Sequence, residues 1–256
     1  MTPDSTQRFT DRVADYVRYR PGYPAALLET LEREAGLTSA STVADIGSGT
    51  GISTELLLRS GCTAWAVEPN AAMRQAAEGW LAGQPGFHSQ SGTAEATGLP
   101  DQSIDLVTAA QAFHWFDVPA GRREFLRILR PPHRVALFWN ARLSDDSPFA
   151  AAYEQLLERF GTDYAAIRHD GREQRLAGEL SNQPWRRFEF PNAQRLDFRG
   201  LRGRLLSSSY VPAADHPARG PMLADLERLF DAFAEDGHVT MSYRTELYLG
   251  TLSSQG

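Results

Sequence analysis

The chain has 256 residues, of which 42% are hydrophobic and 23% are charged, so it can form one large domain with a sizeable buried core. Its net charge of −6 argues against a nucleic-acid partner, because non-specific binding needs a basic face that neutralises phosphates. All 26 basic residues are arginine, which excludes a Walker A loop, an internal pyridoxal aldimine and dehydrogenases that need a catalytic lysine.

The sequence carries no signal for a metal, a disulfide, export or a membrane. Cys62 is the one cysteine, which excludes an internal disulfide, and the six histidines are scattered without ligand spacing. The polar start has no signal-peptide stretch, and no apolar run approaches the roughly 20 residues that span a bilayer. We therefore expect a cytoplasmic protein with no metal and no membrane partner.

Two helices are predicted in residues 1–40, which we expect to form a lid. Apolar residues recur at helical spacing over residues 10–20, and Pro21 ends this pattern because the residue before a proline avoids the helical region. The second helix is predicted to begin at Pro24, which suits a first turn, and to end before Gly36, which suits the left-handed position after a helix.

Strands and helices alternate over residues 41–140, which we expect to bind a cofactor. Asn70 and Asp117 are good N-caps for two of the helices, and Pro131 with Pro132 ends the second of them. The predicted strands cover residues 42–46, 63–67, 87–90, 104–110 and 135–139, with helices over 52–59, after Asn70 and after Asp117. This alternation predicts an α/β fold, a doubly wound, Rossmann-like, mostly parallel sheet with helices on both faces.

Helical patterns dominate after residue 140, and a long alternating strand follows at the end. The predicted helices cover 149–160, 164–180, 201–206 and 223–233, a strand or hairpin region covers 188–198, and an antiparallel strand covers 238–249. Arg168, Arg172 and Arg175 are most simply a solvated helix face. We expect a helical insertion before the last strands, five parallel strands plus a C-terminal antiparallel hairpin, and a single domain over residues 1–256, in which 141–256 hold the insertion and the last strands.

A glycine loop follows the first predicted strand. Residues 45–51 read Asp-Ile-Gly-Ser-Gly-Thr-Gly and lead into a helix, so the backbone can turn sharply and approach a bound nucleotide closely. Glu68 ends the next strand, where its carboxylate suits the two ribose hydroxyls of an adenosine.

Three features of this loop distinguish between cofactors. The dinucleotide fingerprint needs a glycine where Ile52 stands, and a phosphate loop needs a lysine that the chain lacks. Asp45 beside the loop repels a pyrophosphate but suits a ligand that carries an ammonium group. S-adenosylmethionine is such a ligand.

Several motifs resemble those of class I S-adenosylmethionine-dependent methyltransferases. The segments that carry this resemblance are residues 43–51, 68–70, 92–95, 99–101, 105–107 and 127–131. Residues 19–24 and 112–117 are similar to the small-molecule branch that includes the trans-aconitate methyltransferases. The resemblance implies a seven-strand sheet and S-adenosylmethionine as the cofactor. Many relatives carry Asp where Thr93 stands, so its bond to adenine is expected to be weaker.

The resemblance and the residues together predict the site. The expected cofactor-binding residues are Asp45, Gly47, Ser48, Gly49, Gly51, Glu68, Pro69, Met73, Thr93, Ala94, Glu95, Gln111, Tyr19 and Arg20. His114 follows the fourth strand and is the candidate general base, while the expected substrate pocket is formed by Trp115, Trp139, Tyr16 and Tyr210.

The sequence therefore predicts an enzyme that methylates a small molecule, a carboxylate or a hydroxyl, by direct displacement. Two alternatives stay open: a nicotinamide-dependent oxidoreductase on a Rossmann sheet, and a non-catalytic module that binds S-adenosylmethionine. Ile52 and the missing lysine argue against the first alternative, and His114 with Trp115 argues against the second.

Overall fold

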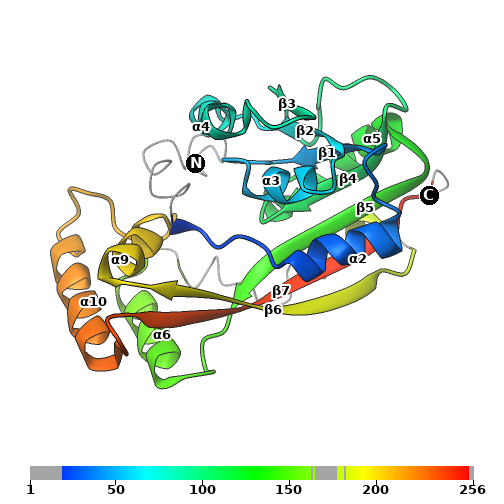
Figure 1. Ribbon diagram of the computed structural model, residues 1–256. Helices are drawn as coiled ribbons and strands as arrows, with labels where there is room; N and C mark the ends of the chain where they lie inside the picture. The colour runs from blue at the N-terminus through cyan, green and yellow to red at the C-terminus, as the bar shows by residue number, and fades with distance from the viewer. Residues whose placement is uncertain (1–18, 163, 165–177, 182, 254–256) are drawn as a thin grey trace.

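A single seven-stranded sheet runs through the protein, whose computed structural model describes residues 19–162, 164, 178–181 and 183–253. The strand order is β3-β2-β1-β4-β5-β7-β6. The bounds are Thr42–Ile46 for β1, Thr63–Val67 for β2, Phe87–Gln90 for β3, Ile104–Ala110 for β4, Leu129–Arg142 for β5, Arg186–Leu196 for β6 and Val239–Thr251 for β7. The first five strands are parallel, and β7 and β6 are antiparallel (Figure 1). The predicted α/β class and mostly parallel sheet are confirmed.

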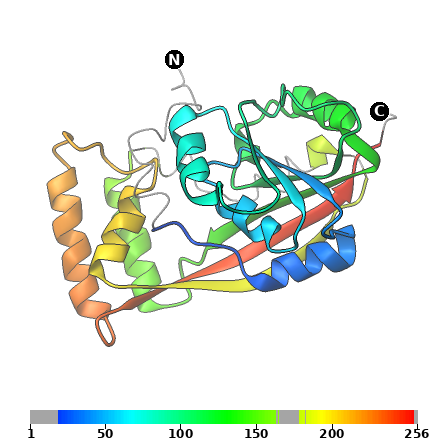
Figure 2. The ribbon, with the colours of Figure 1, turned by 45° about the horizontal axis from the view of Figure 1, so that its top comes forward.

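The helices are divided between the parallel core and the opposite end of the molecule. The core carries α2 (Ala25–Ala35), α3 (Ile52–Leu58), α4 (Ala71–Leu81) and α5 (Val118–Ile128), while α6 (Pro148–Phe160), α9 (Phe198–Leu206) and α10 (Arg219–Phe233) surround the far ends of β6 and β7 (Figures 1 and 2). The predicted caps are confirmed: Asn70 accepts from the amide of Met73 at 3.0 Å, and Asp117 accepts from that of Ala120 at 3.0 Å.

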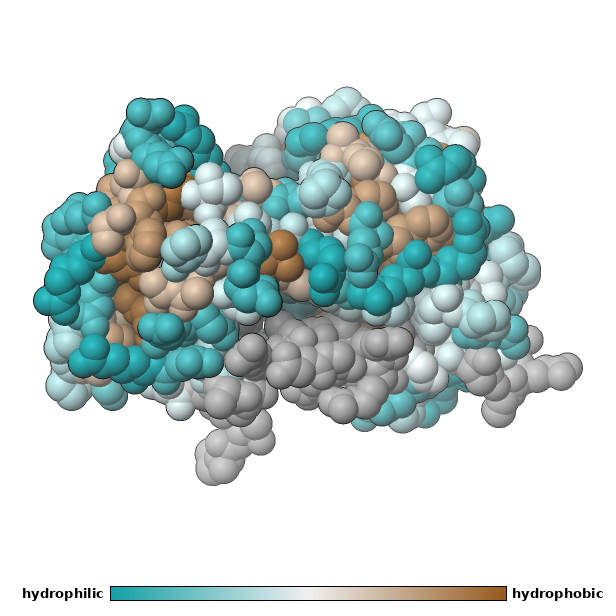
Figure 3. Space-filling view, turned by 90° about the horizontal axis from the view of Figure 1, so that it is seen from below, coloured by the Kyte–Doolittle hydropathy of each residue, from teal (hydrophilic) through white to brown (hydrophobic). Residues whose placement is uncertain are grey.

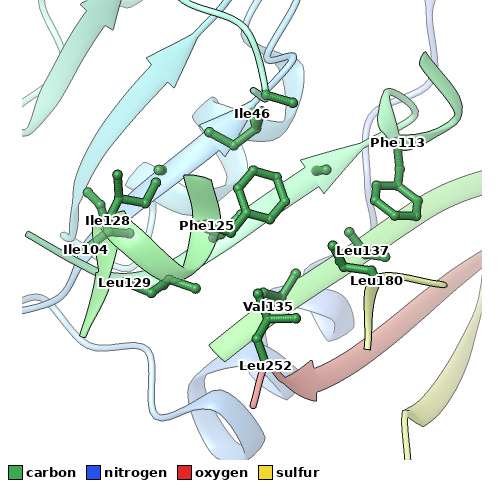
Figure 4. Close-up of a cluster of buried hydrophobic side chains, with 14 of the residues drawn as sticks. Ile46, Ile104, Phe113, Phe125, Ile128, Leu129, Val135, Leu137, Leu180 and Leu252 are labelled. Atoms are coloured by element: carbon green, nitrogen blue, oxygen red, sulfur yellow. The ribbon is translucent and has the colours of Figure 1, made fainter. Parts of the chain in front are cut away.

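Strand β5 separates two hydrophobic layers because its side chains alternate between the two faces of the sheet. Val135 and Leu137 belong to one buried cluster with Phe125 of α5, and Figure 4 shows these three side chains together. Ala136 and Phe138 belong to a second cluster, on the side of α2 and α3. Burial on both faces explains why this segment of the strand reads as a continuous apolar run.

A third cluster holds the helical end together. Tyr153 of α6, Leu201 of α9 and Leu226 of α10 pack with Met241 and Tyr243 of β7. Hydrophobic side chains also gather on this end of the molecule in the face seen from below, at the left of Figure 3. No helix in the described part of the chain has the length and apolar character that crossing a membrane requires.

Two predictions about the C-terminal half need correction. Strand β5 covers Leu129–Arg142 rather than 135–139, because β7 continues to pair with it beyond the end of β4, as far as Arg142 opposite Tyr243. The last two strands are not a simple hairpin, because α9 and α10 lie between them in the chain, so the helical insertion is split around β6.

Some predicted features lie wholly or mostly outside the described residues. These are the helix over 10–20, most of the helix over 164–180, Tyr16 and the arginines at 168, 172 and 175.

Candidate functional site

Two cavities open at the carboxyl ends of β1, β4 and β5, where ligands bind in open parallel sheets. The smaller cavity, of about 150 Å³, contains Glu68 and Glu95, and we name it the acidic cavity. The larger, of about 240 Å³, contains Arg20, Arg142, Glu154 and Arg204, and we name it the basic cavity.

The glycine loop lies between the two cavities, because Gly47 and Gly49 line both. The amides of Gly47 and Ser48 donate to the carbonyl of Val67 at 2.8 and 3.2 Å, which fixes the loop to β2. Gly47 and Gly49 have φ angles of 68° and 57°, a region that favours glycine. A Cβ on Gly47 would lie 2.6 Å from the Cβ of Ala112, so this turn has no room for a side chain.

Glu68 is held at the end of β2 by the backbone. Its Oε1 accepts from the amide of Asn70 at 2.8 Å, and its Oε2 accepts from the amide of Gly49 at 2.9 Å. Burial raises the pKa of this carboxyl above its ordinary value, and the two amide bonds oppose that shift. A carboxylate has about four acceptor positions, so Glu68 keeps acceptor capacity for the hydroxyls of a ribose.

The loop after β3 forms another wall of the acidic cavity, through Thr93, Ala94 and Glu95. Its far end is tied to α5, because Glu124 accepts from the amide and the hydroxyl of Thr97 at 2.8 and 2.6 Å. Arg127 donates to the same carboxylate, and these bonds lower the pKa of Glu124 to about 2. The loop is therefore positioned by a buried ionised carboxylate.

These features fit the nucleoside and sulfonium parts of S-adenosylmethionine. The acidic cavity combines the fixed Glu68 with apolar walls from Met73, Ala94 and Phe116. The hydroxyl oxygens of Ser48 and Thr50 are buried and have no hydrogen-bond partner within the described structure, although both residues line the basic cavity. Such buried polar atoms require a partner, and a polar ligand at the loop supplies one.

The two cavities meet at the end of β4, where Ala110 and Gln111 line both. Gln111 has a φ angle of 57°, a left-handed conformation that costs a residue with a side chain about 1–3 kcal/mol. Its amide donates to the carbonyl of Phe138 at 3.0 Å and its side chain donates to that of Asn140 at 3.2 Å. The surrounding strands therefore hold this strained residue at the junction.

The basic cavity is closed by segments that are far apart in the sequence. Arg20 donates to the carbonyl of Ser207 at 2.9 Å, which attaches the segment before α2 to the end of α9. The other contributing residues are Asn140 and Arg142 from the end of β5, Glu154 from α6, Tyr164, Arg204 from α9, Tyr210 and Tyr243 from β7.

Most of the predicted cofactor residues line one or both cavities. In the acidic cavity are Gly47, Gly49, Glu68, Pro69, Met73, Thr93, Ala94, Glu95, Gln111 and also Trp115, and in the basic cavity are Arg20, Ser48 and Tyr210. Trp115, expected in the substrate pocket, therefore lines the acidic cavity together with Glu68.

Five other predicted residues do not line either cavity. Asp45 is fully buried, where its carboxylate accepts from Ser53, Thr54 and Thr108 and burial raises its pKa. This places Asp45 in a bond network that joins β1, α3 and β4. Trp139 packs in the core and stacks on Tyr248 with ring centroids 5.0 Å apart.

The remaining three also have positions set by packing. Gly51 packs against α4, since a Cβ there would lie 2.6 Å from the Leu81 side chain. Tyr19 packs its ring onto Gly203 of α9. His114 lies in a short turn of 3₁₀ helix, with its ring 4.7 Å from that of Trp115.

Sequence reasoning missed much of the basic cavity, including Tyr23, Asn140, Arg142, Glu154, Tyr164, Arg204 and Tyr243. Arg142 lies shortly after the predicted apolar strand 135–139, at the edge where a parallel sheet binds ligands, and this was the one available signal. The others come from helices and from a distant strand, whose convergence no local pattern specifies.

Comparisons of the sequence identify relatives. Residues 44–137 match the family described as "Methyltransferase domain". An uncharacterized methyltransferase from Schizosaccharomyces pombe is 33% identical over 152 residues, which are 59% of this chain and 59% of the relative. An uncharacterized methyltransferase from Mycobacterium bovis is 37% identical over 139 residues, 54% of each chain. The matches thus span less than two thirds of these curated relatives.

Comparison of the structure extends over nearly the whole chain. A solved structure from Anaeromyxobacter dehalogenans, proposed to be a type II methyltransferase, aligns with a TM-score of 0.70 at 23% identity. The alignment covers 91% of this chain and 98% of that one. The similarity in fold therefore includes the helical end as well as the sheet.

Proposed function

We propose that this chain, which carries a methyltransferase domain over residues 44–137 on the class I methyltransferase fold, transfers a methyl group from S-adenosylmethionine to a small molecule. The observation that carries the proposal is the junction of two cavities at Gly47, Gly49 and Gln111. A nucleoside site and an acceptor site that share one wall let a methyl group pass directly between their ligands.

The acidic cavity holds the adenosine. Glu68 binds the ribose hydroxyls, and the loop that carries Thr93 and Ala94 lies against the adenine beside Met73. Ser48, Thr50 and Arg20 are available to the polar end of the cofactor, since they line the basic cavity next to the glycine loop. Asp45 acts from behind the loop by fixing α3 to β1 and β4, and does not contact the cofactor.

When bound, S-adenosylmethionine supplies an activated methyl group on a sulfonium centre. The contribution of this chain is alignment and exclusion of water, which together can supply roughly 7–11 kcal/mol of the barrier. Gln111 is suited to alignment, because its backbone amide is bonded to the carbonyl of Phe138 and its side chain to the carbonyl of Asn140. Arg20, Pro21 and Tyr23 form part of the wall of the basic cavity.

A carboxylate is the acceptor that this site favours over a hydroxyl. A carboxylate is already ionised at neutral pH, whereas a hydroxyl needs a base to remove its proton. His114, the candidate base, is not among the residues that line the described cavities. The net charge of −6 supports a small molecule rather than a nucleic acid.

Release of S-adenosylhomocysteine tests this function. The protein is incubated with S-adenosylmethionine and a metabolite extract freed of macromolecules, and the product is measured by mass spectrometry. We expect extract-dependent release by the wild-type protein and none by Gly49→Val. Gly49 lines both cavities and has a positive φ angle, so a valine there strains the loop and adds a side chain where the two cavities adjoin. Gly220→Ala, at an open position on α10, is the matched control.

Two outcomes contradict the proposal. Tighter binding of NAD than of S-adenosylhomocysteine would indicate an oxidoreductase. Binding of S-adenosylhomocysteine with no acceptor in any extract fraction would indicate a non-catalytic module.

A further inference from the structure

The basic cavity contains a buried positive charge that the proposed cofactor site does not explain. Arg204 is only 6% exposed, and its guanidinium donates to the hydroxyls of Tyr243 and Ser208, both at 3.1 Å. Across the described residues no carboxylate forms an ion pair with it. Burying a charge without an opposite charge costs several kcal/mol, so a bound anion is the partner that this arrangement lacks.

Arg142 presents a second donor to the same cavity. Its Nη2 donates to Glu154 and, at 2.9 Å, to the hydroxyl of Tyr164, which also donates to Glu154. These bonds fix the plane of the guanidinium. Nη1 of Arg142 is buried and has no hydrogen-bond partner in the described structure. Nη2 of the guanidinium is thus occupied, whereas the N–H donors of Nη1 have no acceptor among the described residues.

The position of Arg142 separates this donor from the methyl-transfer junction. Ala110 at the junction pairs with Phe138 of β5, and Arg142 lies four residues further along that strand. At roughly 3.3 Å per residue, the two backbone positions are about 13 Å apart. The basic cavity therefore extends along β5 from the glycine loop toward the helical end.

Chemistry also separates anion binding from methyl acceptance. A carboxylate oxygen bound by a guanidinium has its lone pairs engaged in charge-assisted hydrogen bonds. Such an oxygen is a poor nucleophile, so the group that Arg142 and Arg204 bind is not the group that receives the methyl.

We infer that Arg142 and Arg204 determine acceptor specificity by binding an oxyanion, a carboxylate or a phosphate, that the acceptor carries in addition to its methylated group. Glu154 and Tyr164 are positioning residues, since both bind Nη2 of Arg142 and leave Nη1 without a partner in the part of the chain that the structure describes. The inference rests on the proposed function for the identity of the second ligand, whereas anion binding itself is measurable without methyl transfer.

The test measures binding by calorimetry with three probes and protein saturated with S-adenosylhomocysteine. Glutarate carries two carboxylates, 4-phosphonobutyrate replaces one of them by a phosphonate, and glutaramide is the neutral analogue. We expect at least one acid to bind ten times more tightly than glutaramide. Tighter binding of glutarate identifies a carboxylate as the second anion, and tighter binding of 4-phosphonobutyrate identifies a phosphate.

Variants assign the binding to the two arginines. Because Arg142→Gln alone removes the cation paired with Glu154, we pair it with Glu154→Gln, so that both charges disappear together. The double variant and Arg204→Gln are each expected to weaken acid binding at least tenfold and to leave glutaramide binding unchanged. Arg159→Gln is the control, because Arg159 lies exposed on α6 in a pair with Asp225.

The outcomes separate the two proposals. Equal acid binding by wild type and variants, or no preference for the acids over glutaramide, overturns the anion site. Failure of the wild type to bind S-adenosylhomocysteine overturns the proposed function instead, and the acid titrations are then carried out with the protein alone.

Discussion

At the scale of single residues, Glu68 has two tasks. Its carboxylate accepts from the amides of Gly49 and Asn70, so it fixes the glycine loop relative to α4. It also lines the acidic cavity, where we propose that it binds the ribose of the cofactor. Because both of its oxygens accept backbone amides, replacing Glu68 by glutamine keeps the shape of the side chain but removes the charge and one of these two bonds.

We expect Glu68→Gln to weaken binding of S-adenosylhomocysteine by about 2 kcal/mol, roughly 30-fold, because charge-assisted bonds to the ribose become neutral ones. Isothermal calorimetry measures the affinity, and circular dichroism shows that the fold is kept. Glu29→Gln, on the exposed face of α2, is the matched control. An unchanged affinity would remove Glu68 from the cofactor site.

At the scale of elements, α5 positions a loop that it does not adjoin in sequence. Glu124 of α5 binds Thr97 and is itself bound by Arg127, so the loop carrying Thr93 and Glu95 is fixed to the helix. The pKa of Glu124 is lowered from 4.5 to about 2, chiefly by the bond from Arg127. A lowered pKa in the folded state means that the ionised carboxylate stabilises the fold.

The sign of this effect gives a prediction for pH. The stabilisation by Glu124 is fully present above the unfolded pKa of 4.5 and is lost as the pH falls toward about 2. We expect Glu124→Gln to lower the free energy of unfolding by about 2–3 kcal/mol at neutral pH. Urea unfolding at successively lower pH should show the gap between variant and wild type closing below 4.5. A gap that stays constant with pH would contradict an ionic origin.

A second element-scale contact joins the N-terminal segment to α9. The ring of Tyr19 packs directly on Gly203, and the carbonyl of Tyr19 accepts from Gln194 of β6 at 3.0 Å. The next residue, Arg20, lines the basic cavity. Because Gly203 has no side chain, the segment that carries Tyr19 and Arg20 can pack closely against α9 beside the cavity.

Gly203→Ala is expected to displace Tyr19, because a Cβ there overlaps its ring. Chymotrypsin cleavage after Tyr19, followed by mass spectrometry, should then be at least several-fold faster than in the wild type. Gly220→Ala has open space around the new methyl group and should leave the cleavage rate unchanged. Equal rates in all three proteins would show that Tyr19 accommodates the methyl group without moving.

At the scale of the whole molecule, two long strands connect the parallel core with the helical end. Strands β5 and β7 pair from Arg134 opposite Thr251 to Arg142 opposite Tyr243, and the basic cavity draws residues from both parts. Under the proposed function, a ligand at the junction of the cavities would contact residues at the ends of β1, β2 and β4 and would lie next to the helical end.

Binding of S-adenosylhomocysteine should therefore stabilise the whole fold. At 100 times the dissociation constant, the free energy of unfolding is expected to rise by about 2.7 kcal/mol. For a chain of this length, that increase corresponds to roughly 5–10 °C in Tm. A thermal scan measures the shift, and NAD at the same concentration should give none. A shift with NAD alone would favour the oxidoreductase.

The sequence by itself determined the parallel core and the cofactor loop. The predicted bounds 42–46, 63–67, 87–90 and 104–110 coincide with β1 to β4, and in β1, β2 and β4 short apolar runs between turn residues specify buried strands locally. The glycines at 47 and 49 and the acid at 68 could be placed for the same reason, since each lies at a fixed offset from a strand end.

Only the tertiary structure decided the extent of β5, the burial of Asp45 and the composition of the basic cavity. Residues 139–142 are strand because β7, about 100 positions later, supplies their hydrogen-bond partners. Asp45 is buried because three hydroxyl groups from α3 and β4 surround it. Arg142 and Arg204 face one cavity because separate hydrophobic clusters dock their elements together, and no local pattern encodes such long-range packing.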